Sequence, residues 1–318
     1  MATCTSVAAT NGTLTVRAVV DAFLNDRRYR LRTGKIKNAK VYDRYHRRCT
    51  SFVDHFGDEH AEDMTDNHIC RWLIDHPEWK SGYTIEDAAG AVVACFRWAD
   101  RQWPKLRLPR LRRPSDLIPS KPVRRPLFKD EFLGVIRESR RGHFHPKSRY
   151  RFRAALFFLW RTGSRTCEMR EALFTDVDWT PGLERVILPP ERTKTGKTRV
   201  IPLEPVAAKL VRLLYRIRLP GQKHIFVNGR GKPYTCQIFA DMFRKLADKV
   251  GVPRNVSAYC TRTSFACRGR KLGFTNDDVA DVLGNSPRTV QKHYDAWQRQ
   301  QADHLTPIAA AITSGRRR

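Results

Sequence analysis

Apolar residues recur at helical spacing through the first hundred residues of the chain. The first run begins near residue 13 and consists of Val16, Val19, Val20 and Phe23. The second run has the spacing i, i+3, i+7, i+10, i+11 and i+14 and consists of Tyr42, Tyr45, Cys49, Phe52, Val53 and Phe56. Each run forms one apolar stripe on a helix. Two further helices are predicted, one at residues 66–75 and one that begins with Thr84 as its N-cap. We therefore expect a compact all-helical domain over residues 13–104, preceded by a loose tail at residues 1–12.

Helical patterns also dominate the second half of the chain, where two short strand patterns interrupt them. The predicted helices lie at residues 129–140, 149–161, 166–174, 204–218, 235–250, 262–272, 276–283 and 287–301. Residues 185–188 and 199–202 are rich in β-formers and flank a turn-like sequence at 194–197, which indicates a β-hairpin. The expected fold class is therefore mainly α with a small β-hairpin or sheet. An α+β domain over residues 127–300 follows the helical domain, and a tail at 301–318 ends the chain.

Residues 105–126 separate the two domains and differ from both in composition. Prolines at four positions exclude a long helix, namely Pro109, Pro114, Pro119 and Pro122. The stretch holds eight basic residues against one acidic residue, Asp116. This composition is typical of a stiff linker that lies along a phosphate backbone, and equally of a solvated connection. The position between two basic domains favours contact with DNA.

The charge of the chain indicates a polyanionic partner. Its 318 residues include 60 Lys and Arg against 32 Asp and Glu, a formal net charge of +28 with a pI near 10.4. Such a charge attracts nucleic acid or an anionic membrane face. A hydrophobic fraction of 41% excludes a disordered basic tail protein. No apolar run reaches the roughly 18 residues of a membrane-spanning helix, and the N-terminus lacks a secretory signal pattern, so we expect an intracellular protein.

The eight cysteines suggest neither a disulfide framework nor a metal centre. They are scattered along the chain without a CxxC pair or a Cys/His set at metal-ligand spacing. Cys260 and Cys267 lie seven residues apart, with no spaced His pair nearby. Reduced thiols in the cores are the better interpretation.

A glycine turn at residues 162–168, Thr-Gly-Ser-Arg-Thr-Cys-Glu, carries the first candidate for phosphate chemistry. It places Arg165 at the start of a helix, where backbone N–H groups and a guanidinium fork suit an anion. The alternative is structural, because an arginine at a helix end commonly pairs with a nearby carboxylate, here Glu168 or Glu171.

Three other segments of the second domain carry further candidates. Lys194 lies at the predicted hairpin tip, where a lysine is often just a polar turn residue. Arg262 lies near the start of a helix that follows Tyr259. Tyr294 lies nine residues after Asn285, at which a Leu-Gly-Asn turn ends the preceding helix. Taken alone, this tyrosine is better explained by packing on an amphipathic helix.

Taken in order, these segments resemble the tyrosine recombinase, or phage integrase, family. The family pattern is an Arg in a TGxR turn, a Lys on a β-hairpin, a His-x-x-Arg box, a Leu-Gly-His box and a Tyr nine residues after that His. The residues that match by type and order are Arg165, Lys194, Arg262 and Tyr294. Secondary matches are Glu168, the run Asp176-Val177-Asp178-Trp179 and the run Val200-Ile201-Pro202-Leu203. The resemblance covers nearly the whole chain and implies a core-binding domain, a basic linker and a catalytic domain with the boundaries given above.

The resemblance implies a site-specific recombinase that cleaves and rejoins DNA strands through a 3′-phosphotyrosyl intermediate. Arg165 and Arg262 would neutralise the scissile phosphate, and Asn285 would donate a hydrogen bond to a non-bridging oxygen. Tyr294 would attack phosphorus, and Lys194 would protonate the departing 5′ oxygen. The covalent intermediate keeps the bond energy, so the resemblance implies no cofactor and no metal.

Two positions depart from the family pattern. Tyr259 stands where the first box has His, and Asn285 stands where the second box has His, or Trp in some members. A phenol or a carboxamide can hydrogen-bond a phosphate oxygen, but neither titrates near neutral pH as imidazole does. We expect activity, at a lower rate. The alternatives are a catalytically weakened or inactive DNA-binding relative, and a strand transferase of the telomere-resolvase or topoisomerase type.

The implied partner is double-stranded DNA at a specific recombination site, bound by a homotetramer that synapses two duplexes, with no membrane contact. The predicted second helix presents a basic face that begins at Lys35 and Lys37. The candidate DNA contacts on this face are Lys40, Arg44, Arg47 and Arg48. The hairpin adds Lys197 and Arg199. The expected location is cytoplasmic, with nucleoid association when the protein is bound to DNA.

Overall fold

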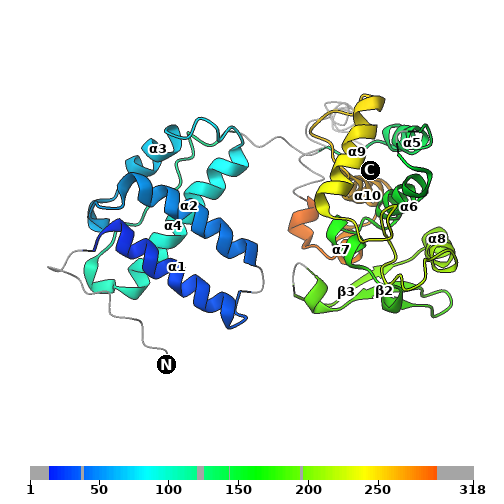
Figure 1. The fold of residues 1–318 in the computed structure, drawn as a ribbon, viewed down its shortest axis with the longest axis horizontal. Coiled ribbons are helices and arrows are strands. Elements are labelled where there is room, and N and C mark those ends of the chain that lie inside the picture. Colours follow the sequence, from blue (N-terminus) through cyan, green and yellow to red (C-terminus); the bar gives the residue numbers. More distant parts are fainter. Residues whose placement is uncertain (1–13, 37–38, 120–124, 143, 194–195, 292–318) are drawn as a thin grey trace, which may run out of the picture. The chain divides into compact units, whose positions relative to one another are not determined.

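The chain divides into two compact units in the computed structural model, residues 1–121 and residues 122–318 (Figure 1). The structure describes residues 14–36, 39–119, 125–142, 144–193 and 196–291. Within this part of the chain, helices dominate both units, and a small three-stranded antiparallel sheet lies in the second unit. The predicted fold class is confirmed.

Four α-helices build the described part of the N-terminal unit: α1 Val16–Arg32, α2 Ala39–Phe56, α3 Asp66–Ile74 and α4 Gly82–Gln102. Short 3₁₀ turns lie at η2 Ala61–Asp63 and η3 Pro104–Leu106. The apolar stripes meet in a largely aromatic core. Phe52 of α2 packs edge-to-face against Trp72 of α3 and Phe96 of α4, with ring centroids 5.3 and 6.4 Å away. Such aromatic pairs add to the free energy of burial and fix the helix faces that turn inward.

Two details of this unit differ from the sequence prediction. The helix α4 begins at Gly82 and not after a cap at Thr84, because the carbonyl of Ser81 accepts the N–H groups of Thr84 and Ile85 and so closes the first turn. The helix α2 begins at Ala39, so Lys35 lies in the connection that precedes it. Lys37 lies outside the described residues.

The proline-rich segment packs on the N-terminal unit over its described part. Leu108 and Leu111 are 3% and 7% exposed and belong to the core of this unit. The backbone N–H of Arg112 donates to Asp66 at 2.7 Å, and Arg113 pairs with Glu86 at 3.5 Å. Residues 105–119 therefore follow the surface of the N-terminal unit.

The second unit contains seven α-helices that lie wholly among its described residues. They are α5 Lys129–Glu138, α6 Pro146–Thr162, α7 Thr166–Glu171, α8 Pro205–Arg216, α9 Cys236–Val250, α10 Cys260–Lys271 and α11 Asn276–Leu283. The strands are β1 Val177–Asp178, β2 Arg185–Leu188 and β3 Arg199–Pro202, in the order β1-β2-β3. Short 3₁₀ turns lie at η4 Phe174–Asp176 and η5 Pro190–Arg192. The predicted hairpin is confirmed: β2 pairs with β3 in a register that places Arg185 opposite Pro202 and Leu188 opposite Arg199.

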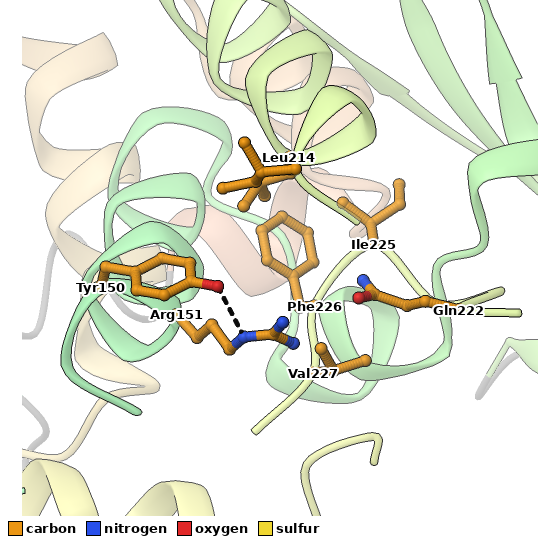
Figure 2. Close-up of a pocket in the computed structure, with 8 residues that line it drawn as sticks. Tyr150, Arg151, Leu214, Gln222, Ile225, Phe226 and Val227 are labelled. Carbon is orange, nitrogen blue, oxygen red and sulfur yellow. Dashed lines mark hydrogen bonds between the residues drawn. The ribbon is translucent and has the colours of Figure 1, made fainter. Parts of the chain in front are cut away.

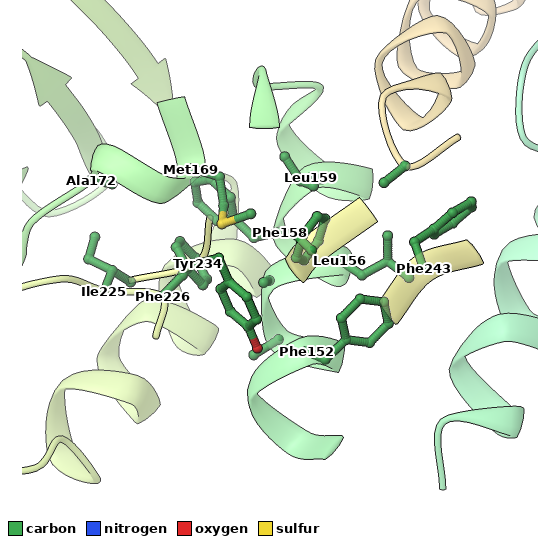
Figure 3. Packing of buried hydrophobic residues seen from close by; sticks show 14 of the residues in the cluster. Phe152, Leu156, Phe158, Leu159, Met169, Ala172, Ile225, Phe226, Tyr234 and Phe243 are labelled. Atoms are coloured by element: carbon green, nitrogen blue, oxygen red, sulfur yellow. The ribbon is translucent and has the colours of Figure 1, made fainter. Parts of the chain in front are cut away.

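The core of the second unit is built around α6 (Figure 3). Phe152, Leu156, Phe158 and Leu159 of this helix are buried and meet residues of α7, α9 and the segment around Phe226. The helix α7 is shorter than predicted, because residues 172–174 leave it to bond the segment 223–225. Between the glycine turn and the sheet, the chain therefore forms only the short helix α7 and the 3₁₀ turn η4. No helix among the described residues is long and apolar enough to cross a membrane.

Candidate active site

The glycine turn between α6 and α7 is held by close packing. Gly163 ends α6 with a φ of +62°, a conformation that favours glycine. A Cβ at this position would lie 2.6 Å from Leu283 and 2.7 Å from Phe265. The turn therefore fixes the start of α7, where Arg165 lies, against α10 and α11.

This packing gives a direct stability prediction for Gly163→Ala. Both the positive φ and the clash with Leu283 and Phe265 oppose a side chain, so we expect a loss of about 2–4 kcal/mol in the free energy of unfolding. Urea or thermal unfolding measures it. Gly182→Ala is the matched control, since Gly182 has a φ of +78° but no heavy atom within 4 Å of a built Cβ. Equal losses in the two variants would contradict the packing argument.

Arg165 is bound on two sides, by Glu168 and by the end of α11. Glu168 is 1% exposed, and its carboxylate accepts the Nη1–H of Arg165 at 2.5 Å and the backbone N–H of Arg165 at 2.8 Å. The Nη2 of Arg165 donates to the carbonyl of Gly284 at 2.9 Å and to Oδ1 of Asn285 at 2.7 Å. The pairing with Glu168 that the sequence offered is confirmed. The expected backbone anion grip is not formed at Arg165, because Glu168 already takes that N–H.

Arg262 lies in the first turn of α10 and is 3% exposed. Its Nη1 donates to the carbonyl of Gly163 at 2.8 Å, and its Nη2 donates to the carbonyl of Leu283 at 2.6 Å. Its Nε–H is buried without a hydrogen-bond partner among the described residues. Arg262 thus joins the glycine turn to the end of α11, while its Nε–H stays unpaired among the described residues.

The end of α11 is where Arg165, Arg262 and Asn285 come together. The last carbonyls of a helix have no partner within it and form the negative end of its dipole. Here the carbonyls of residues 283 and 284 accept from Arg262 and Arg165. Because Oδ1 of Asn285 accepts from Arg165, the Nδ2 group of Asn285 is left as the donor of that side chain.

This cluster carries an excess of positive charge. Burial, followed by the charge of Arg165, lowers the pKa of Arg262 to about 10, although Glu168 and an ionised Tyr259 act in the opposite direction. Arg199 lies in the same cluster, and burial lowers its pKa as well. Three guanidinium groups thus surround one buried carboxylate among the described residues. Such a cluster favours a bound anion, because the negative charge would compensate the buried guanidinium groups for the water that they lack.

Tyr259 directly precedes α10 and is half-buried. Its carbonyl accepts the backbone N–H of Arg262 at 3.1 Å. The structure therefore places this departure from the family pattern next to Arg262. Lys197 is exposed beyond the hairpin strands, and its carbonyl accepts the hydroxyl of Thr193 at 2.8 Å. Lys194 and Tyr294 lie outside the described residues, as do residues 292–301 of the last predicted helix, whose described part is helical at 287–291.

Arg199 occupies a different place from the one predicted for it. Sequence analysis assigned it to a DNA-contacting surface, yet Arg199 is 8% exposed and turned into the protein. Its Nη2 donates to the carbonyl of Val282 and its Nη1 to that of Val200, both at 2.6 Å. A side chain buried in this way presents no guanidinium to a DNA backbone, so that prediction is corrected.

The basic face of α2 carries its own acidic partner. Lys40 and Arg47 are exposed, whereas Arg44 and Arg48 lie 3.5 and 3.7 Å from the carboxylate of Asp87 on α4. Arg48 also lies over the ring of Trp79, 4.5 Å from its centroid. Asp87 carries no signal in the sequence, because its contact with α2 is set by helix packing and not by spacing along the chain.

A small cavity in the second unit lies among residues that sequence analysis did not select. It measures about 10 Å³, roughly the space of one water molecule. Figure 2 shows its lining, in which the Nε–H of Arg151 donates to the hydroxyl of Tyr150 at 3.0 Å. The other labelled residues are largely apolar. This cavity is a packing void between α6, α8 and the segment around Phe226, with no room for a substrate.

The same fold occurs in solved structures of DNA-bound recombinases. The Tn1549 transposon integrase in complex with transposon right end DNA has a TM-score of 0.70 at 15% identity, over 92% of this chain and all of that one. A lambda integrase tetramer bound to a Holliday junction has a TM-score of 0.67 at 17% identity, over 88% of this chain and 80% of that one. The XerH site-specific recombinase bound to palindromic difH substrate has a TM-score of 0.66 at 17% identity, over 86% and 80%. These likenesses define an integrase-like fold.

The chain belongs to the phage integrase family, whose model matches residues 133–301. The tyrosine recombinase XerD of Halalkalibacterium halodurans is 27% identical over 150 residues, which cover 45% of this chain and 48% of that protein. The tyrosine recombinase XerD of Corynebacterium glutamicum is 30% identical over 149 residues, which cover 45% and 47%. The chain thus spans about half the length of the curated relatives it matches.

Proposed function

We propose that the protein is a site-specific DNA recombinase that cleaves and rejoins strands through a 3′-phosphotyrosyl intermediate. The observation that carries the proposal is the cluster at the end of α11, where Arg165 and Arg262 donate to two successive carbonyls and Arg165 also pairs with the buried Glu168. A phosphodiester resists attack because the nucleophile meets negative charge, and two guanidinium groups neutralise that charge. Membership of the phage integrase family supports the same reaction.

In the proposed reaction the hydroxyl oxygen of Tyr294 attacks phosphorus, so that a tyrosyl O–P bond forms and the bond from phosphorus to the 5′ oxygen breaks. The phenol loses its proton to a nearby base, and Lys194 gives a proton to the departing 5′ oxygen as general acid. Religation reverses these steps. The covalent intermediate conserves the bond energy, so the reaction uses no nucleotide and no metal.

Two side chains that replace family histidines take supporting roles in this proposal. The Nδ2 group of Asn285 donates to a non-bridging phosphate oxygen, since Arg165 already occupies Oδ1. Tyr259 lies beside Arg262 and assists the loss of the proton from Tyr294. The test of the function is a nicked suicide substrate that carries the recombination site, located from the repeats that flank the gene. We expect a covalent adduct at the 3′ end of the cleaved strand, without metal or nucleotide, whereas binding without any adduct would favour a DNA-binding relative.

We further propose that residues 13–104 form the core-binding domain, that residues 105–126 join it to the catalytic domain at 127–300, and that both domains hold duplex DNA. Four protomers would synapse two duplexes and exchange strands in pairs, as the assembly of the lambda integrase tetramer on a Holliday junction suggests. The described part of the joining segment packs on the N-terminal unit through Leu108 and Leu111. Its Arg113 lines the same surface hollow as Arg44 and Arg48 and so extends the basic face of that unit.

The basic face of α2 gives a binding prediction. Replacing Arg44, Arg47 and Arg48 with Ala should weaken DNA binding, because fewer counterions are released. The negative slope of log K against log salt should become shallower by about 0.9 for each phosphate that the variant no longer neutralises. Fluorescence anisotropy over a salt series measures the slope. Asp87→Asn is the opposite control, since it frees Arg44 and Arg48 from their carboxylate and should raise the affinity. An unchanged slope in the triple variant would exclude α2 from the interface.

A further inference from the structure

Arg199 is a buried cation that the proposed reaction does not use. It is the first residue of β3, which returns from the hairpin tip towards the core. Its Nε lies 3.8 Å from Oε2 of Glu168, and its Nη2 donates to the carbonyl of Val282 in the last turn of α11. One guanidinium thus joins three segments that are far apart in the sequence: the hairpin, α7 and α11.

The packing of Gly284 against Arg199 shows how closely the two segments fit. A Cβ on Gly284 would lie 3.0 Å from Cδ, Cζ and Nε of Arg199, so the side chain of Arg199 leaves little room for one at position 284. Gly284 also ends α11 with a φ of +62°, and Asn285 follows it. Any movement of Arg199 is therefore transmitted to the turn that carries Asn285.

Three arginines donate to three successive carbonyls at the end of α11. Arg199 donates to residue 282, Arg262 to residue 283 and Arg165 to residue 284. Arg165 is also held by Glu168, which Arg199 contacts from the other side. Arg199 therefore supports both partners of Arg165, the carboxylate and the helix end.

We propose that Arg199 is a positioning residue of the proposed site, which fixes Arg165 and the Asn285 turn for the scissile phosphate without touching the phosphate itself. A third buried cation beside Arg165 and Arg262 is unfavourable for stability alone, because apolar residues of similar volume fill such sites as well or better. Its presence is explained if the side chains that bind the phosphate must be in position before DNA binds, since small displacements of such side chains slow a reaction strongly. This inference rests on the proposed function.

The test is Arg199→Met, which keeps much of the side-chain volume and removes the guanidinium. We expect single-turnover cleavage of the suicide substrate to slow by about 100-fold. The affinity for the duplex and the salt slope should stay unchanged, since Arg199 reaches no phosphate. Arg185→Met is the matched control: Arg185 lies in the same sheet and pairs with Asp178 at 2.8 Å, away from α11. It should cleave at nearly the wild-type rate.

Two readouts separate positioning from a general loss of structure. The double variant Arg199→Met/Arg165→Ala should be no slower than Arg165→Ala alone, because residues that act through one another are not additive. On a substrate with a neutral methylphosphonate at the scissile position, the cleavage rates of wild type and Arg199→Met should differ less than on the phosphodiester. The same should hold for wild type and Arg165→Ala. The reason is that a neutral phosphorus centre needs less cationic stabilisation.

Each alternative outcome is informative. The positioning role would be overturned if Arg199→Met cleaved at the wild-type rate. It would also be overturned if the rate losses were additive in the double variant, or if the rate difference between wild type and Arg199→Met were the same on the methylphosphonate substrate. Weaker binding with a shallower salt slope would make Arg199 a DNA contact. If Arg199→Met does not fold by circular dichroism, Arg199→Lys carries the same test, because an ammonium group does not span Val282 and Glu168 together. A wild-type protein that forms no adduct would instead remove the proposed function.

Discussion

Tyr294→Phe is expected to abolish the covalent protein–DNA adduct while DNA binding is retained. The change removes only the hydroxyl oxygen, so the side chain keeps nearly its full size, but no atom is left to form the bond to phosphorus. The measurement is denaturing electrophoresis of the protein after incubation with the nicked suicide substrate. A gel-shift or anisotropy titration on the same samples measures binding. We expect complete loss of the adduct and a dissociation constant close to that of wild type.

Tyr259→Phe is the matched control, since it removes the same hydroxyl from a tyrosine that directly precedes α10 beside Arg262. It should slow adduct formation without stopping it, because Tyr259 takes a supporting role. The assignment of the nucleophile would be wrong if the adduct persisted in Tyr294→Phe and disappeared in Tyr259→Phe.

Arg165→Lys should reduce cleavage by about 100- to 1000-fold, the usual loss when one charged donor to a transition state is removed. The guanidinium fork of Arg165 can pair with Glu168 and with the end of α11 and still present an N–H group to the phosphate. The single ammonium group of a lysine cannot reach all three partners at once. DNA affinity should change little, because many other cations would contact the DNA backbone in the proposed complex. The cleavage rate in single turnover and the melting temperature together measure the effect.

Arg262→Lys should lose cleavage to a similar extent, but the structure adds a cost in stability. Arg262 bonds the carbonyls of Gly163 and Leu283, and a lysine leaves one of these buried groups unpaired. We expect the free energy of unfolding to fall by about 1–3 kcal/mol. Arg165 is therefore the cleaner site for this test. Near-full cleavage rates in both lysine variants would show that the two arginines are structural.

Much of the fold follows from periodicity in the sequence. The hairpin strands lie at the predicted residues, because alternating β-formers on both sides of a Gly-containing turn leave little freedom. The strand β1 escaped prediction because a strand of two residues has no period to detect. The packing of Leu108 and Leu111 was missed for a similar reason, since isolated apolar residues between prolines form no stripe.

The site was predictable in part. The order and spacing of Arg165, Arg262 and Asn285 selected them, although contacts across 99 and 120 residues follow only from the fold. Arg199 was misplaced because a basic residue at the end of a hairpin usually lies on the surface. A signal was present: the two-residue period of β3 puts Arg199 on the same face as Ile201, which is fully buried.

The packing around Gly163 also limits how this sequence can vary during evolution. Leu283 and Phe265 fill the space that a side chain at position 163 would need, while the carbonyl of Gly163 holds Arg262. A larger residue at 163 is therefore compatible with the fold only when position 265 or 283 becomes smaller and the turn keeps its left-handed conformation. These three positions should change together among related chains, as residues in direct contact do. Apolar residues outside the arginine cluster thus limit which substitutions the cluster can accept.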